Sequence, residues 1–145
     1  MAFRWQLVTA GIVAMVWLPG CGLRGDKLEA EQVLVHYFDS RAHRSYGSAL
    51  NDYDEQFFED VTRADWGKAL ADVDNKLGPL KGYEIYVHGL ESRITAGPGL
   101  YLKFKCKVEH AKQTSDETFF LYRRTGAAKF KILGHQIDSL GLLSQ

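Results

Sequence analysis

Between residues 36 and 53 the sequence gathers the side chains best suited to transferring protons. The candidates are His36, Tyr46, Asp52 and Tyr53. A catalytic acid or base needs a pocket in which burial shifts its pKa toward the working pH. Tyrosines between helices and a sheet usually bury the ring and use the hydroxyl in one hydrogen bond, and Asp52 stands where a helix cap is expected. We therefore interpret these residues as structural and expect no catalytic residue.

A metal site is the other chemistry that this region could hold. His36 and His43 lie two helical turns apart with Asp39 between them. A protein zinc site needs three or four ligands, and no second pair accompanies these histidines. The sequence also lacks a phosphate-binding loop, a nucleophile elbow, an H-E-x-x-H motif and a C-x-x-C motif. We expect neither a metal nor a cofactor.

The composition is that of one globular domain. The chain has 145 residues, of which 46% are hydrophobic and 25% are charged. Its 18 basic and 18 acidic residues cancel. Because nucleic-acid binding depends on a basic field, we expect no nucleic-acid partner.

The first residues have the pattern of an export signal. Arg4 precedes a run from Trp5 to Leu18 that has no ionisable side chain, and the helix breakers Pro19-Gly20 end it. A helix that spans a bilayer needs roughly 20 apolar residues, which is more than this run supplies. We interpret residues 1–20 as a signal peptide that is removed.

The end of that segment resembles a bacterial lipobox, in which a leucine three places before a cysteine and a small residue just before it direct acylation of the thiol. Leu18, Gly20 and Cys21 match, and Pro19 departs from the usual residue. The resemblance implies cleavage before Cys21 and a membrane anchor of fatty, palmitate-like chains on its sulfur. Gly22 resembles the pattern of lipoproteins sent to the outer membrane, so we expect the chain there, facing the periplasm. The alternative is a plain secretory signal with an incidental Cys21.

The mature chain is then expected to comprise the acylated cysteine with a short flexible tether, residues 21–26, and one domain, residues 27–145. Helical spacing of apolar residues predicts a helix from Lys27 to about Arg44, with Arg41 off its apolar face. A shorter helix is predicted in "YGSALNDYDEQFFED". A third begins at a capping box of Thr62 and Asp65 and ends at Gly78-Pro79.

After Leu80 the apolar period changes from about 3.6 to 2, which indicates half-buried strands. The predicted strands lie in "GYEIYVHGLESRI", "LYLKFKCKVEH", "ETFFLYRR" and "AKFKILGHQID". Helices followed by an antiparallel meander of about four strands define the α+β class.

Besides this order of elements, the sequence has Trp66, "KLGPLKGYEI" at the helix-to-strand crossing and "FKILGHQID" at the end. Together these features resemble the nuclear transport factor two-like (cystatin-like, cone-shaped) superfamily, especially its small bacterial lipoproteins of unknown function. The resemblance implies a curved sheet closed by helices around a pocket. In some relatives that pocket holds a hydrophobic ligand, and in a few it works as an isomerase, dehydratase or cyclase. Relatives also commonly pair through the outer face of the sheet.

Strand alternation predicts which side chains face that pocket. The inward positions are Tyr83, Ile85, Val87, Leu102, Phe104, Cys106, Val108, Phe119, Leu121, Phe130 and Ile132. None of these is an acid or a histidine, and Cys106 is interpreted as a small buried hydrophobe.

The outward positions carry a second group of aromatic side chains. They are Tyr86, His88, Tyr101, Phe120 and Tyr122, among Lys103, Lys105 and Lys107. Aromatic residues on an exposed sheet face favour a contact surface for a second copy or a partner protein. The alternative is that they reflect strand propensity alone.

We therefore expect a lipid-anchored periplasmic binding or interaction domain without catalytic activity. Its ligand would be a partner protein, a second copy or a small apolar molecule. The alternative is an isomerase- or hydrolase-like enzyme of the same fold, which a carboxylate or histidine at the floor of an open pocket would favour.

Replacing Cys21 by Ser is expected to release the chain from membranes, because the acyl group is attached through the thiol. Membrane fractionation measures this, and Cys106→Ser, which leaves the acylation site intact, is the control. A Cys21→Ser chain that still fractionates with membranes would contradict the anchor.

Overall fold

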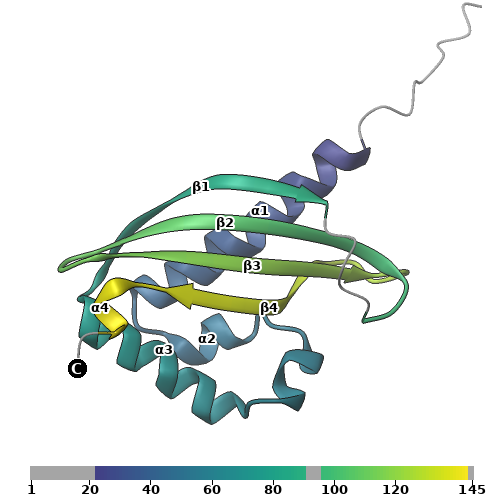
Figure 1. Ribbon diagram of the computed structural model, residues 1–145. Coiled ribbons are helices and arrows are strands. Elements are labelled where there is room, and N and C mark those ends of the chain that lie inside the picture. Colours follow the sequence, from purple (N-terminus) through teal and green to yellow (C-terminus); the bar gives the residue numbers. More distant parts are fainter. Residues whose placement is uncertain (1–21, 91–95, 144–145) are drawn as a thin grey trace, which may run out of the picture.

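The computed structural model describes residues 22–90 and 96–143, in which helices pack against an antiparallel sheet (Figure 1). In chain order the elements are α1 (Gly22–Ala42), α2 (Tyr46–Leu50), the 3-10 helix η1 (Glu55–Glu59), α3 (Arg63–Leu77), β1 (Leu80–Leu90), β2 (Gly99–His110), β3 (Thr114–Arg124), β4 (Lys131–Asp138) and α4 (Leu140–Leu143). The four strands pair in the order β1-β2-β3-β4. The predicted α+β class and four-stranded meander are confirmed.

The first helix is longer than the periodicity predicted. It begins at Gly22, so residues 22–26, expected to be a flexible tether, are helical. Arg123 on β3 forms ion pairs of 2.6 Å with both Asp26 and Glu29, which hold these first turns against the sheet. A sequence pattern does not reveal this support, because it comes from a residue nearly a hundred positions away.

The second predicted helix is divided, because the backbone around Tyr53 pairs with the start of β4. Asp54 N donates to Ile132 O, and Ile132 N donates to Asp52 O, each at 2.8 Å. α2 therefore ends at Leu50 and η1 begins at Glu55.

The third helix begins and ends as predicted. Thr62 Oγ1 accepts a hydrogen bond from Asp65 N at 3.1 Å, which satisfies one of the free amides of the first turn. Gly78 ends the helix with a φ of 92°, a conformation that favours glycine.

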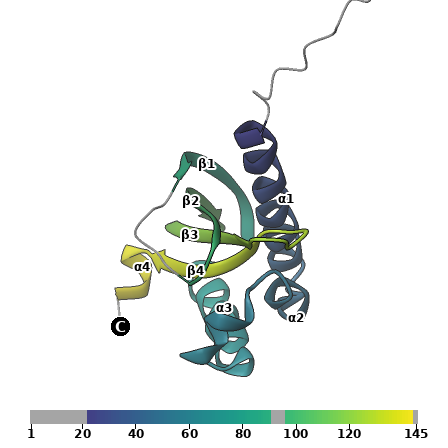
Figure 2. The same cartoon turned by 90° about the vertical axis from the view of Figure 1, so that its right-hand side faces the viewer.

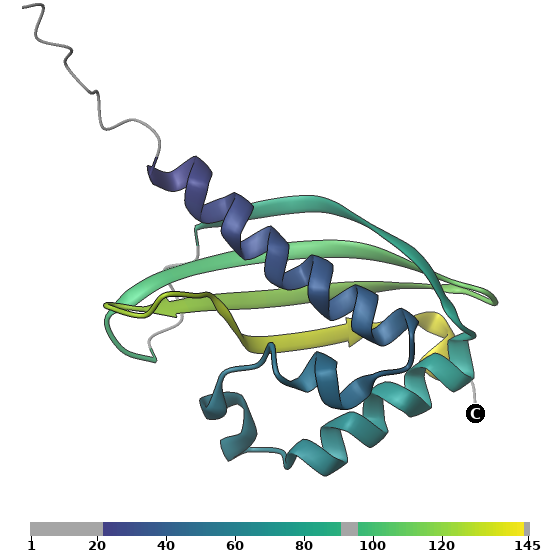
Figure 3. The same cartoon turned by 180° about the vertical axis from the view of Figure 1, so that it is seen from behind.

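The helices cover one face of the sheet and one of its edges. α1 crosses that face diagonally (Figure 3), and α2 and α3 lie beside the edge strand β4 (Figure 1). Figure 2 shows the strong curvature of the strands beside α1. α4 lies at the end of β4, where Lys76 Nζ on α3 donates to Leu142 O at 3.1 Å.

Two of the three register shifts in the described sheet redirect histidine side chains. In β1 the pairing moves from Ile85 opposite Cys106 to Val87 opposite Lys105, so His88 lies opposite the buried Phe104. The prediction that His88 faces outward is therefore wrong, because a bulge adds one residue and reverses the alternation beyond it.

The same effect changes β4. Ile132 lies opposite Leu121, and Gly134 lies opposite Phe120, so one extra residue separates the two pairs. His135 consequently lies opposite Phe119, on the face that packs against the helices.

An aromatic cluster fills the space between the sheet and the helices. The ring of Phe119 lies 5.3 Å from that of Tyr37, 5.5 Å from that of Phe38 and 4.1 Å from that of His135, measured between centroids. Tyr37, Phe38 and Phe119 are at most 1% exposed. Rings from α1, β3 and β4 therefore share one closely packed core.

Phe119→Ala is expected to lower the free energy of unfolding by about 3 to 5 kcal/mol, because it leaves a cavity among these rings. Denaturation in urea measures the change. Leu140→Ala is the control, since Leu140 is 84% exposed and its loss is expected to cost under about 0.5 kcal/mol. Similar costs for the two variants would contradict the packing described.

Candidate functional site

An open groove of about 500 Å³ lies between α1 and the connection from β3 to β4. Its lining residues are Glu29, Gln32, Val33, His36, Asp52, Ala128, Lys129, Phe130 and Lys131. The α1 members recur every three or four residues, so they share one face of the helix. Asp52 reaches the groove because the backbone pairing with Ile132 fixes the segment after α2 beside β4.

Two of the residues considered for proton transfer meet in this groove. His36 Nδ1 lies 2.6 Å from Asp52 Oδ2. The His36 side chain is 54% exposed and the Asp52 side chain is 15% exposed. Burial raises the pKa of Asp52, although His36 and Lys131 partly oppose the shift. A carboxylate that accepts from Nδ1 leaves Nε2 of the neutral ring as an acceptor.

The rest of the lining combines charge with apolar surface. Glu29 Oε2 accepts a hydrogen bond of 2.6 Å from Arg123. The guanidinium of Arg123 also lies 4.7 Å from the centroid of the Phe130 ring, a distance typical of a cation–π contact. Lys131 Nζ donates to Asn51 O at 2.6 Å. The groove can therefore hold a ligand that has an apolar body and polar ends.

A second set of ionisable residues lies wholly inside the domain. Arg41 on α1 contacts Asp74 on α3, with Nε within 3.0 Å of Oδ1, and Glu117 on β3, with Nη1 within 2.7 Å of Oε1. The three side chains are at most 2% exposed. We call these residues the Arg41 cluster. Tyr46 joins it by donating to Asp74 Oδ2 at 3.0 Å.

A chain of hydrogen bonds extends the cluster to β4. The Tyr53 hydroxyl lies 2.7 Å from His135 Nδ1, and His135 Nε2 lies 2.8 Å from Glu117 Oε2. These partners fit a neutral ring that accepts from Tyr53 and donates to Glu117. Burial lowers the pKa of His135, in agreement with a neutral imidazole.

The charge of Arg41 decides the ionisation of Glu117. Burial alone raises the pKa of this carboxyl, but the guanidinium of Arg41 and the hydrogen bond from His135 outweigh burial and hold the pKa at about 2. Burial also raises the pKa of Tyr46 to about 12 and that of the Cys106 thiol to about 12. The tyrosine and the thiol are therefore uncharged at neutral pH.

The structure corrects the expectation that no acid or histidine of the sheet faces inward. Three such side chains point inward: Glu117, His110 and His135. Glu117 and His110 follow the same alternation as Phe119 and Val108, so the pattern itself could have revealed them. His135 could not be found in this way, because the register shift in β4 precedes it.

The sequence also contains a partial signal for the two members of the cluster that lie on helices, Arg41 and Asp74. Arg41 lies on the buried face of α1, four residues after Tyr37 and three after Phe38, and not off the apolar face as predicted. Asp74 follows the buried Leu70 by one helical turn. The spacing marks both positions as inward, but only the folded chain shows that they meet.

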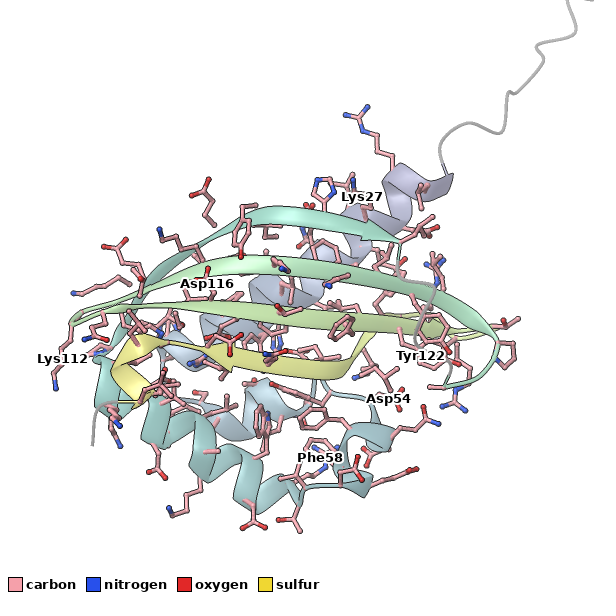
Figure 4. The ribbon with its side chains drawn as sticks, viewed as in Figure 1. Lys27, Asp54, Phe58, Lys112, Asp116 and Tyr122 are labelled. Atoms are coloured by element: carbon pink, nitrogen blue, oxygen red, sulfur yellow. The ribbon has the colours of Figure 1, made fainter. Side chains whose placement is uncertain are left out.

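The outward aromatic face is smaller than predicted. Tyr122 is only 1% exposed, because its hydroxyl donates to Pro98 O at 3.1 Å and its ring stacks on Tyr101, with 4.6 Å between centroids. Residues 97–99, at the start of β2, and Tyr101 thus cover Tyr122, which Figure 4 labels. Tyr86 is 50% exposed and donates to Asp116 Oδ1 at 3.3 Å. Phe120 is half-buried beneath Lys103, whose Nζ lies 5.4 Å from the ring centroid.

The remaining expectations concern metals and membranes. Among residues 22–90 and 96–143, no group of three or more histidine, cysteine or acidic side chains is arranged to hold a metal ion. His43 contacts only Asp39 on its own helix in the contacts described. None of the helices described is both long enough and apolar enough to cross a membrane. Leu18, Gly20 and Cys21 lie outside the described residues.

Comparison with known proteins gives no family. No protein-family model and no curated protein matches the sequence. Among solved structures, the chain is similar to the helical cell shape determining protein Pgp2 from Campylobacter jejuni, with a TM-score of 0.48 and 14% identity over 72% of this chain. The match spans 38% of that protein's length.

Arg41→Met is expected to lower the free energy of unfolding by about 3 to 5 kcal/mol at neutral pH, because it leaves Asp74 and Glu117 buried without a counterion. Arg44→Met is the control, since Arg44 forms an exposed hydrogen bond to Asn75. Urea denaturation measures both variants.

The loss of unfolding free energy in Arg41→Met should depend on pH. Because the pKa of Glu117 is lowered on folding, its carboxylate stabilises the native chain above the unfolded pKa, and this contribution is lost as the pH falls from 4.5 toward about 2. The difference between native chain and Arg41→Met should therefore shrink on acidification. A difference that is independent of pH would contradict the assigned role of the cluster.

Proposed function

We propose that this chain is a lipid-anchored domain of the bacterial cell envelope that binds a ligand or partner and carries out no covalent chemistry. It would be attached through Cys21, at the outer membrane and facing the periplasm. We also propose that its α+β body is a nuclear transport factor two-like cone. The order of helices and curved sheet supports that assignment, and the lipobox-like residues support the anchor.

The groove between α1 and the β3–β4 connection is the observation that carries the binding function. It is open to solvent, and its volume of about 500 Å³ is within the range that small-molecule sites occupy. Val33, Ala128 and the edge of Phe130 supply apolar contact, and Lys129 and His36 supply polar contact. A small ligand with an apolar body and an acidic or hydrogen-bonding end fits this lining.

The state of the interior supports binding over catalysis. A catalytic acid or base must reach the substrate, but the side chains of the Arg41 cluster are at most 2% exposed and are bonded to one another. Their arrangement matches a structural role, in which paired charges join helices to strands. The accessible surface of the groove is then left for recognition.

Ala128→Trp is expected to lower ligand occupancy at least about tenfold, which corresponds to about 1.4 kcal/mol, because the indole ring would fill the groove. Native mass spectrometry of chain extracted gently from envelopes measures the bound mass. Ala64→Trp, at an exposed position on α3, is the matched control and should retain the ligand. Native chain that carries no bound mass, or equal occupancy in both variants, would contradict a ligand site in the groove.

The contact of His36 with Asp52 favours a second candidate, an isomerase- or hydrolase-like enzyme of the same fold. In that case His36 Nε2 would act as a general base toward a ligand in the groove. Incubation of the co-purified ligand with native chain and with His36→Gln separates the two functions. Conversion by the native chain alone would favour the enzyme, and recovery of unchanged ligand from both would favour the binding domain.

A protein partner or a second copy remains part of the proposal for the outer sheet face. Tyr86, Tyr101 and Phe120 are the predicted aromatic residues that keep exposed surface there. Any contact on this face would centre on Tyr86 and Phe120, because Tyr122 is covered and His88 faces α1.

A further inference from the structure

The N-terminal turns of α1 carry a surface that neither the groove nor the Arg41 cluster explains. Leu23 and Leu28 are 48% and 55% exposed. With Arg24, Lys27, Glu31 and the β1 residue His88, they line a hollow of about 330 Å³. We call residues 23–28, at this end of α1, the α1 tip. Figure 1 shows that this end of the helix projects past the sheet.

The charged residues at and beside the α1 tip differ in whether they form ion pairs. Asp26 and Glu29, on one side of the helix, are both held by Arg123 at 2.6 Å. Arg24 and Lys27 have no ion pair among the described residues, and the first turn of α1 contains no acid. Glu31 is the acid that borders the hollow, so two cations face one anion there when His88 is neutral.

Exposed leucines beside cations without an ion pair in the described residues suit the surface of a lipid bilayer, which has an apolar interior and anionic headgroups. Side chains of this kind enter the boundary between headgroups and acyl chains, and each nearby cation gains from anionic lipid. Leu90, which is 63% exposed at the end of β1, lies at the same end of the molecule (Figures 1 and 3). Three of the seven large exposed hydrophobic residues in the described part of the chain thus lie at this end.

The position of the α1 tip favours a lipid bilayer as the surface that it contacts. Gly22 is the first residue of α1, so a lipid on the preceding residue would place the tip within reach of the headgroups. We propose that the α1 tip docks on the membrane surface, with Leu23 and Leu28 in the interfacial region and Arg24 and Lys27 at lipid phosphates. This inference rests on the proposed lipid anchor and gives the domain a fixed orientation.

The test compares the two ends of the molecule on vesicles. Leu143 on α4 is 77% exposed and lies far from the α1 tip (Figure 1), so it is the matched control. The acylated full chain with Leu28→Cys or with Leu143→Cys is labelled with an environment-sensitive fluorophore; Cys106 is buried. Each chain is reconstituted into vesicles of phosphatidylethanolamine and phosphatidylglycerol that contain lipids with spin-labelled acyl chains.

Docking predicts that the fluorophore at position 28 is quenched at least about twofold by spin-labelled lipid, and that the one at position 143 is quenched by less than about a tenth. Arg24→Glu together with Lys27→Glu should reduce quenching at position 28, because both cations become anions near anionic lipid. Equal quenching at the two positions, or none at either on vesicles that carry the chain, would overturn the docking alone.

Flotation of the same samples reports on the anchor separately. Chain that floats with vesicles while position 28 stays unquenched retains its lipid anchor but does not dock through the α1 tip. Chain that fails to float, with no lipid mass on Cys21, would overturn the proposed anchor and the docking with it.

Discussion

The guanidinium of Arg41 is the group on which the rest of the interior depends. It lies between two carboxylates that belong to elements distant in the sequence, Asp74 on α3 and Glu117 on β3. Each of these three charges would be costly to bury alone, because the interior cannot replace the water that they lose. Together they neutralise one another in part, Tyr46 and His135 add hydrogen bonds to the two carboxylates, and Tyr53 contacts His135. Since charge-assisted hydrogen bonds of this kind are short and directional, the cluster constrains how α1 and α3 sit against the sheet.

Because side chains fill the interior, the ionisable residues that a ligand could reach lie in the surface groove. The aromatic rings around Phe119 and the Arg41 cluster occupy the space between the helices and the sheet. The groove beside α1 is instead bounded by a helix face, the segment after α2 and the β3–β4 connection. Arg123 links these features, because it holds the first turns of α1 through Asp26 and Glu29 and also covers the ring of Phe130. The same residue therefore shapes the groove and pairs with two acids near the α1 tip.

The α1 tip and one wall of the groove follow one another along α1, and Cys21, the proposed anchor, directly precedes this helix in the sequence. Leu23 and Glu29 are six residues apart, which is about 9 Å along an α-helix. A domain that docked through the α1 tip would hold the near end of its groove within about one Debye length of the lipid headgroups. Such a position suits a ligand that leaves or enters the membrane, and it keeps the outer sheet face free for another protein.

The sequence by itself determined the fold class and the order of helical segments followed by four strands. The α+β class, the capping box of Thr62 and Asp65 and the four-stranded meander follow from local rules of spacing and capping, and the structure agrees. Alternation also places Glu117 inward, although a charged residue at an inward position is easily read as an exception. Only the tertiary structure decided that Arg41, Asp74 and Glu117 meet, that His135 and His88 face the helices and that Tyr122 is covered. The physical reason is that one extra residue in a strand reverses every later side chain, and that a buried charge is stable only beside partners that folding brings from elsewhere in the chain.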